Sequence, residues 1–206
     1  RRSSDLGIKV FAGDTLEVQG RLLHAGAAQP LCWLMLNKPV HVVSTASDPQ
    51  GRTTVLDCVP PPWQGMRVYP VGRLDYFSQG LLLLTNDGKL ANRLTHPRWH
   101  LPKTYRVLVR PEQGAESVDR CLDVMRRGMT LSEGEQLLPV TCARLPYKGQ
   151  GVLLELVLRQ GVNRQIRRMC RDLSLTVLRL CRIAEGPILL GELPVGKWRV
   201  MTKEEI

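Results

Sequence analysis

The sequence contains no long hydrophobic run. Its apolar segments stop well short of the roughly 20 residues that a membrane-spanning helix requires, and it does not open with a signal-peptide pattern. These absences argue against a membrane partner and favour a cytoplasmic protein. The chain begins at Arg1 rather than at a methionine, so we expect the native protein to extend further toward its N-terminus.

Metal and disulfide motifs are also missing. No two cysteines form a C-x-x-C pair, and the histidines lack the spacing typical of metal ligands. Cysteines scattered through apolar segments are typical of free thiols in a reducing compartment. The sequence therefore predicts neither a zinc site nor a disulfide framework. The residues concerned are Cys32, Cys58, Cys121, Cys142, Cys170, Cys181, His24, His41, His96 and His100.

Acidic residues are scarce relative to basic ones. The chain has 29 lysines and arginines against 19 aspartates and glutamates, a formal net charge of +10. Such an excess favours a polyanionic partner, most simply nucleic acid. A protein that is merely basic remains the alternative at this point. The hydrophobic content of 43% is enough to build a core.

Hydrophobic periodicity predicts an α+β protein. Apolar or alternating runs indicate strands, and three segments have the 3.6-residue period of helices. Because strands outnumber helices without regular βαβ alternation, we expect a largely antiparallel mixed sheet with flanking helices. The expected strands are 31–39, 67–71, 80–85, 103–110, 137–145, 151–159 and 175–183, with short ones in the C-terminal tail, and the expected helices are 89–97, 116–128 and 161–173.

The first residues indicate a separate small module. Residues 8–23 alternate around Gly13 and Asp14 and predict a hairpin, which is followed by the linker-like segment HAGAAQP. We therefore divide the chain into residues 1–26, the end of a small module with its linker, and residues 27–206, one larger domain.

One stretch, VGRLDYFSQGLLLLTNDGKL, places charge against the core. Leu81 to Leu84 form an unbroken apolar run that predicts a strand buried on both faces. Arg73 and Asp75 lie in the short loop before it. A surface turn is the ordinary explanation for an aspartate in a loop, so a functional role requires support from elsewhere in the chain.

A second stretch, GVNRQIRRMCRDL, predicts a helix with two opposed faces. One face is apolar, and the other carries a stripe of arginines, which repel one another at this spacing. Such a stripe calls for anions: RNA phosphates, or a buried carboxylate for one of the arginines. A solvated basic face is the alternative. The apolar face comprises Ile166, Met169, Cys170 and Leu173, and the stripe comprises Arg164, Arg167, Arg168 and Arg171.

Together these stretches resemble the pseudouridine synthases, in particular the Rsu-type branch that modifies ribosomal RNA. The segment Gly72–Leu82 matches the pattern G-R-L-D-x-x-[S/T]-x-G-L-L of the catalytic motif. Leu36–Thr45, Lys103–Val107 and Gly161–Met169 resemble three further motifs in the same order, so the resemblance covers residues 31–206. Residues 1–26 resemble, weakly, the end of the alpha-L RNA-binding module that often precedes this catalytic domain.

The resemblance implies an isomerisation that needs no cofactor and no metal. Asp75 would be the carboxylate at C1′ of a uridine extruded from ribosomal RNA, acting either on the sugar or on a 2′ proton. Arg167 would hold that carboxylate ionised through two parallel hydrogen bonds, and Tyr105 would stack on the uracil.

Further residues are implied as RNA contacts. Arg73 would fill the gap left by the extruded nucleotide, and Ile183 would form the floor of the uracil pocket. The candidate contacts to the RNA backbone are Lys103, Asn163, Arg164, Arg168 and Arg171. One departure concerns the first motif, because His41 stands where the family usually has glycine. A solvated loop histidine is the better interpretation of His41 than a general base.

Two other functions remain to be weighed. A non-catalytic rRNA-binding or ribosome-assembly protein would explain the charge, but not Asp75 and Arg167 in matching motifs. A hydrolase would usually need a second carboxylate or a histidine as partner. Within the branch, G-x-N-R-Q and DPQGRTTVLD favour large-subunit rRNA as substrate, and we expect a monomer.

Overall fold

The computed structural model describes residues 15–18, 20–23, 29–95, 98 and 101–205. The chain forms two compact units, Arg1–Pro30 and Leu31–Ile206. In the first unit, β1 (Leu16–Val18) and β2 (Arg21–Leu23) form an antiparallel hairpin that turns near Gly20. The predicted turn at Gly13 and Asp14 lies outside the described residues, as does the predicted domain boundary after residue 26.

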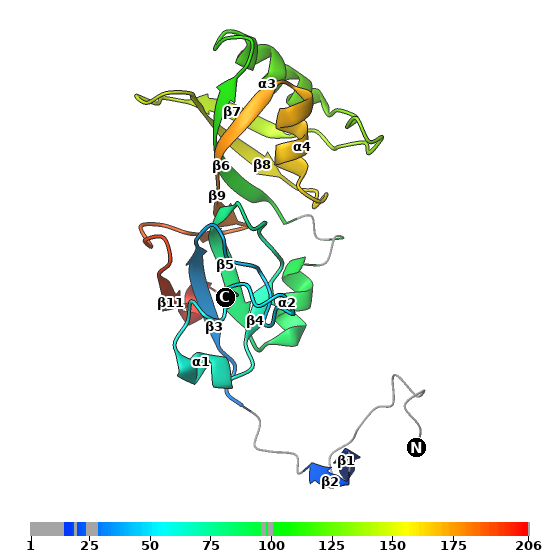
Figure 1. The fold of residues 1–206 in the computed structure, drawn as a ribbon, viewed down its shortest axis with the longest axis vertical. Coiled ribbons are helices and arrows are strands. Elements are labelled where there is room, and N and C mark those ends of the chain that lie inside the picture. Colours follow the sequence, from blue (N-terminus) through cyan, green and yellow to red (C-terminus); the bar gives the residue numbers. More distant parts are fainter. Residues whose placement is uncertain (1–14, 19, 24–28, 96–97, 99–100, 206) are drawn as a thin grey trace. The chain divides into compact units, whose positions relative to one another are not determined.

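The second unit is built on one mixed sheet (Figure 1). Its path is β11-β3-β5-β9-β6-β8-β7, with β10 paired to β9 and β4 paired to β5. The strands are β3 (Trp33–Lys38), β4 (Tyr69–Val71), β5 (Gln79–Thr85), β6 (Lys103–Pro111), β7 (Thr141–Leu145), β8 (Val152–Leu158), β9 (Leu175–Glu185), β10 (Ile188–Leu189) and β11 (Trp198–Val200). The helices are α1 (Pro61–Gly65), α2 (Gly88–Thr95), α3 (Ser117–Arg127) and α4 (Gln165–Asp172), followed by a 3₁₀ turn at Lys203–Glu205.

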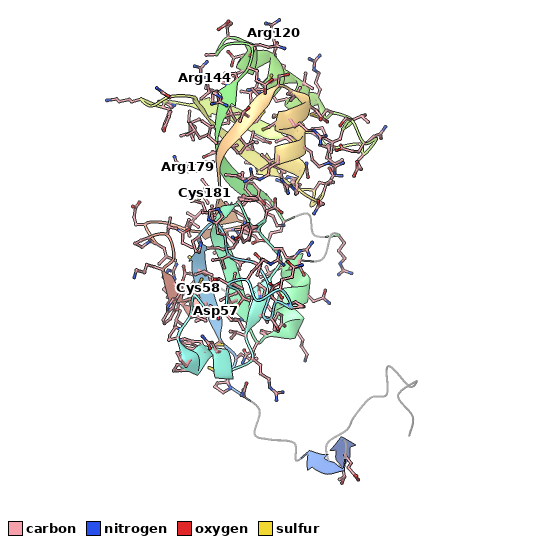
Figure 2. All side chains as sticks on the ribbon, viewed as in Figure 1. Asp57, Cys58, Arg120, Arg144, Arg179 and Cys181 are labelled. Atoms are coloured by element: carbon pink, nitrogen blue, oxygen red, sulfur yellow. The ribbon has the colours of Figure 1, made fainter. Side chains whose placement is uncertain are left out.

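Strand pairing confirms the predicted fold class. Among the described strands every pair is antiparallel except β5 with β9, which run parallel through Gln79–Cys181 and Gly80–Arg182. In the described part of the chain, no helix is both long and apolar enough to cross a membrane. Every cysteine is a free thiol, and Cys58 and Cys181 lie in separate segments (Figure 2).

The hydrophobic core explains why the residues that follow the charged loop are all apolar. Leu82 and Leu84 on one face of β5 pack in one hydrophobic cluster, and Leu81 and Leu83 on the other face pack in a second. All of Leu81–Leu84 are fully buried, which confirms the strand predicted to be covered on both faces. A third cluster joins α3 and α4 to one face of β6, β8 and β9.

A glycine permits the parallel pairing that brings the two halves of the sheet together. Gly80 has φ 113°, and a Cβ at this position would lie 2.6 Å from the backbone nitrogen of Arg182. Any side chain here would force β5 away from β9. Because the charged loop leads directly into β5, this close approach also sets the position of the loop relative to β9.

We expect Gly80→Ala to destabilise the protein by about 2–5 kcal/mol, since backbone strain and overpacking act together. Urea unfolding of the two proteins measures the difference. Gly191→Ala is the matched control: Gly191 has φ 60° but nothing within 4 Å of its added Cβ, so strain alone should cost about 1–2 kcal/mol. Equal losses in the two variants would show that the contact with β9 is not the constraint.

Candidate active site

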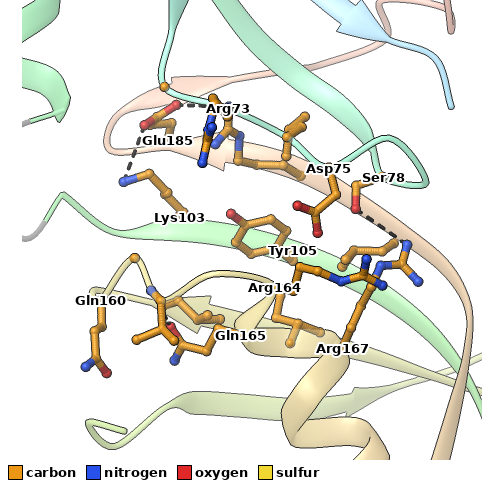
Figure 3. Close-up of a pocket in the computed structure, with 18 of the residues that line it drawn as sticks. Arg73, Asp75, Ser78, Lys103, Tyr105, Gln160, Arg164, Gln165, Arg167 and Glu185 are labelled. Atoms are coloured by element: carbon orange, nitrogen blue, oxygen red, sulfur yellow. Dashed lines mark hydrogen bonds and ion pairs between the residues drawn. The ribbon is translucent and has the colours of Figure 1, made fainter. Parts of the chain in front are cut away.

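Three of the four motifs converge on one pocket of about 290 Å³. It is lined by the loop between β4 and β5, the start of β6, the segment leading into α4, and β9 (Figure 3). The sequence-predicted residues Arg73, Asp75, Lys103, Tyr105, Arg164 and Arg167 all line it. Segments more than 90 positions apart in the sequence thus form a single site.

Asp75 presents an open carboxylate to this pocket. The residue is half-buried, and among the described residues no side chain or backbone group donates a hydrogen bond to its carboxylate. Its loop is held by the backbone instead. Ser44 Oγ donates to the Leu74 carbonyl at 2.8 Å and accepts from the Leu74 amide at 3.1 Å. The carboxylate is therefore positioned by its backbone and left available to a ligand.

Lys38 supports the same loop from beneath. Its side chain is fully buried, and its ammonium donates to the carbonyls of Pro39 and Ser78 at 2.8 and 2.9 Å. Burial lowers the pKa of Lys38 to about 8, while the nearby charges of Cys58 and Asp75 act in the opposite direction. Lys38 and Ser44 both hold the Asp75 loop in position. The segment Leu36–Thr45, which resembles the first motif, therefore has a structural role in the site.

Arg167 reaches the loop but does not form the predicted contact. Its Nη2 donates to the Phe77 carbonyl at 2.7 Å and to Ser78 Oγ at 3.5 Å, and the two parallel bonds to Asp75 are absent. Burial lowers the pKa of Arg167, and the Asp75 charge opposes this shift. Arg167 thus holds the turn that follows Asp75 through Nη2, whereas its Nε is buried without a hydrogen-bond partner among the described residues.

A buried polar network lies on the β9 side of the pocket. The Arg182 guanidinium donates to the Leu81 carbonyl at 2.8 Å and pairs with Glu185 at 3.4 Å, while Glu185 also pairs with Lys103 at 3.4 Å. Burial raises the pKa of Tyr105, and the positive charge of Arg182 partly offsets the rise. Arg182 and Glu185 were not predicted from the sequence, where the only signal is charge inside an apolar strand.

Residues 33–172 match the profile of the RNA pseudouridylate synthase family. An uncharacterized RNA pseudouridine synthase of Aquifex aeolicus is 38% identical over 98% of this chain and 78% of its own. The ribosomal large subunit pseudouridine synthase B of Bacillus subtilis is 36% identical over 98% of this chain and 80% of its own.

This chain belongs to the RNA pseudouridylate synthase family. A crystal structure of a pseudouridylate synthase agrees in fold, with a TM-score of 0.75 at 28% identity, covering 96% of this chain and 81% of the other. The predicted family and enzyme class are therefore confirmed, and a non-catalytic RNA-binding protein is not favoured.

Ile183 is not among the described residues that line the pocket of the synthase. The pairing of β6 with β9 shifts between Thr104–Ala184 and Tyr105–Arg182, so Ile183 is the extra residue of a β-bulge. The bulge places both Arg182 and Glu185 on the pocket side, and Leu180 supplies the apolar wall. The bulge explains why Arg182 and Glu185, rather than Ile183 between them, line this side of the pocket, and a contact of Ile183 with uracil stays a prediction.

The arginine stripe of the synthase is divided between two environments. Helix α4 begins only at Gln165, and Arg164 precedes it with φ 49° and lines the pocket beside Arg167. Arg168 instead pairs with Glu133 and Glu135, and Arg171 pairs with Glu133 and Asp172. Anions do meet these two arginines, but they are carboxylates of the protein. An RNA contact by Arg168 or Arg171 stays a prediction.

This ionic cluster predicts a specific response to acid. Arg168 and Arg171 lower the pKa of Glu133 to about 2, below the ordinary value of about 4.3. A carboxyl with a depressed folded pKa contributes stability above pH 4.3, and that contribution is lost as the pH falls toward 2. We expect Glu133→Gln to reduce this part of the pH dependence, measured by urea unfolding between pH 5 and pH 2. Glu192→Gln, an exposed acid outside the cluster, should follow the wild type.

Proposed function

We propose that this synthase converts a specific uridine of ribosomal RNA, most simply of the large subunit, into pseudouridine. The observation that carries the proposal is the open Asp75 carboxylate, placed in a pocket that is also lined by Tyr105 and four arginines. The large-subunit assignment is supported by the Bacillus subtilis relative, and the net charge of +10 supports RNA as the substrate.

In this proposal Asp75 acts at the glycosidic bond. The reaction breaks the N1–C1′ bond, turns the uracil and rejoins it through C5, without oxidation or reduction. Asp75 either attacks the sugar or removes the 2′ proton, and both roles require the ionised carboxylate. The positive charge of Arg167 favours that form, and its bonds to Phe77 and Ser78 hold the loop during the reaction.

The remaining pocket residues would receive the base and the strand. Tyr105 would stack on the extruded uracil, with Leu180 and the Arg182–Glu185 pair at one edge. Arg73 is exposed and would fill the gap in the RNA. Arg164 and Lys103 line the pocket and Asn163 an adjoining cavity of about 420 Å³, so these three would contact the RNA backbone. Arg168 and Arg171 would do so only after release from their carboxylates.

Three further features belong to the same proposal. Residues 1–26 would be the end of an alpha-L RNA-binding module, followed by the catalytic domain 27–206; the separation of Arg1–Pro30 from the rest supports a division in this region. The protein would act as a monomer in the cytoplasm. It would need no cofactor, because the reaction is an isomerisation.

Mapping of pseudouridine tests the proposal. Ribosomal RNA from cells with and without the protein is compared position by position in both subunits, and we expect one site in large-subunit RNA to lose its pseudouridine. Purified protein should restore that site in EDTA without added nucleotide. A site lost from small-subunit RNA would correct the substrate. An unchanged map, with the protein still bound to rRNA, would favour the non-catalytic alternative.

A further inference from the structure

Three aromatic rings gather at the rim of the active site. The ring centroids of His41 and Tyr76 lie 5.3 Å apart, those of His41 and Phe77 5.6 Å, and those of Tyr76 and Phe77 5.1 Å. His41 is exposed, and Phe77 is 55% exposed. We call these three side chains the aromatic platform. None of them has a part in the chemistry proposed for Asp75.

The backbone of His41 holds the platform together at the cost of strain. His41 has φ 63°, a left-handed conformation that residues with a Cβ disfavour, and its amide donates to the Tyr76 carbonyl at 2.7 Å. Glycine would adopt this conformation without strain. A histidine here adds a ring to the exposed surface that the backbone geometry does not require, and strained residues of this kind cluster at functional sites.

The platform is continuous with the catalytic loop. Tyr76 and Phe77 directly follow Asp75, and the Phe77 carbonyl holds Arg167. Tyr76 also lines the adjoining cavity, which shares Arg73 and Asp75 with the main pocket. A strand whose target uridine reaches Asp75 must therefore pass close to these rings.

Positive charge surrounds the platform. Arg52 and Arg73 line the adjoining cavity, and Arg164 and Arg167 line the main pocket. Asp48 engages Arg52 in a pair of hydrogen bonds, at 3.0 and 2.7 Å, which fixes the guanidinium in place. Aromatic faces beside basic groups form the combination that binds single-stranded nucleic acid, since bases stack on the rings and cations meet the phosphates.

We propose that the aromatic platform stacks the unpaired base of a nucleotide next to the target uridine. This inference rests on the proposed function, in which the target uridine leaves its stack. Extrusion removes a stacking partner from each neighbouring base, and the platform supplies a replacement surface for one of them. The occupant is thus a nucleobase of the substrate strand, bound through its face, so the interaction tolerates any base.

The test measures dissociation constants and single-turnover rates with an rRNA fragment that contains the target site. Matched fragments carry an abasic nucleotide immediately 5′ or immediately 3′ of the target. The variants are His41→Gly, which keeps a permitted backbone, and Phe77→Ala, which keeps the carbonyl that holds Arg167. Leu189→Ala, which shortens another exposed apolar side chain outside both cavities, is the control.

We expect Phe77→Ala to weaken binding of the intact fragment about fivefold or more, and His41→Gly to weaken it less. One of the two abasic fragments should bind the wild type correspondingly more weakly. Neither variant should weaken that fragment further, because the interaction is already absent. Leu189→Ala should bind like the wild type and keep the wild-type single-turnover rate at saturating RNA.

Two results would overturn the inference. Wild-type affinity of both platform variants for the intact fragment would show that no base stacks there. Equal weakening on intact and abasic fragments would show that the rings contact something other than a neighbouring base. Failure of the proposed function is a separate result, namely the absence of pseudouridine from every fragment treated with wild-type enzyme, whatever the dissociation constants are.

Discussion

Asp75→Asn abolishes pseudouridine formation while fold and RNA affinity stay close to those of the wild type. The amide has the shape of the carboxylate but cannot attack the sugar or accept a 2′ proton. Because no hydrogen bond or ion pair holds the Asp75 carboxylate among the described residues, its replacement removes no structural contact. The rate should fall at least by the 10²–10⁴-fold that a positioned acid–base group supplies, and further if the intermediate is covalent.

Single-turnover assays and RNA dissociation constants measure this result, and urea unfolding confirms the fold. Asp87→Asn is the matched control. Asp87 lies in the same stretch, VGRLDYFSQGLLLLTNDGKL, but its carboxylate accepts from the Leu90 amide at 3.1 Å at the start of α2, a contact that asparagine can reproduce. Its activity should be normal. Substantial turnover by Asp75→Asn would remove Asp75 from the chemistry.

Arg167→Met slows the chemical step far more than it weakens RNA binding. Methionine keeps the apolar stem and removes both the charge beside Asp75 and the bonds to Phe77 and Ser78. The carboxylate then loses the cation that favours its ionised form, and the loop loses a support. We expect a fall of about 10²-fold or more in the single-turnover rate, since small displacements of reacting groups have effects of this size.

Two further variants separate this role from general phosphate binding. Arg167→Lys should retain part of the activity, because a point charge remains without the planar fork. Arg171→Met is the matched control on the same helix. Its wild-type partners are Glu133 and Asp172, which lie outside the pocket, so the single-turnover rate at saturating RNA should be normal. If Arg167→Met also keeps a normal rate at saturating RNA, its proposed influence on Asp75 is wrong.

The local sequence pattern was sufficient to locate the Asp75 loop and the strands and helices around it. The run Leu81–Leu84 predicts a strand buried on both faces because each residue of the run is apolar, and hydrophobic burial acts residue by residue. Helix α3 was predicted within one residue at each end, from its apolar period and the glycine that follows it. The family resemblance rests on contiguous motifs, which can be recognised in the sequence without knowledge of the fold.

Partners across the site were less predictable, because they depend on contacts between distant segments. The donors of Arg167 meet the Phe77 carbonyl, which no side-chain pattern reveals. The division of the arginine stripe follows from the acids of the 133–135 loop, which packs beside α4 only in the folded chain.

One extra residue in β9 determines which side chains of that strand line the pocket. Alternation along a strand assigns every second side chain to one face, whereas the family resemblance had placed Ile183 at the floor of the pocket. The bulge at Ile183 resets the alternation, so that Arg182 and Glu185 face Tyr105 and Lys103. A bulge arises from the pairing of two strands that are distant in sequence, and the residues of β9 alone do not reveal it. The amino-acid pattern thus determines the fold class, the family and the place of Asp75, whereas the charges that surround the substrate are set by how β6, β9 and α4 meet.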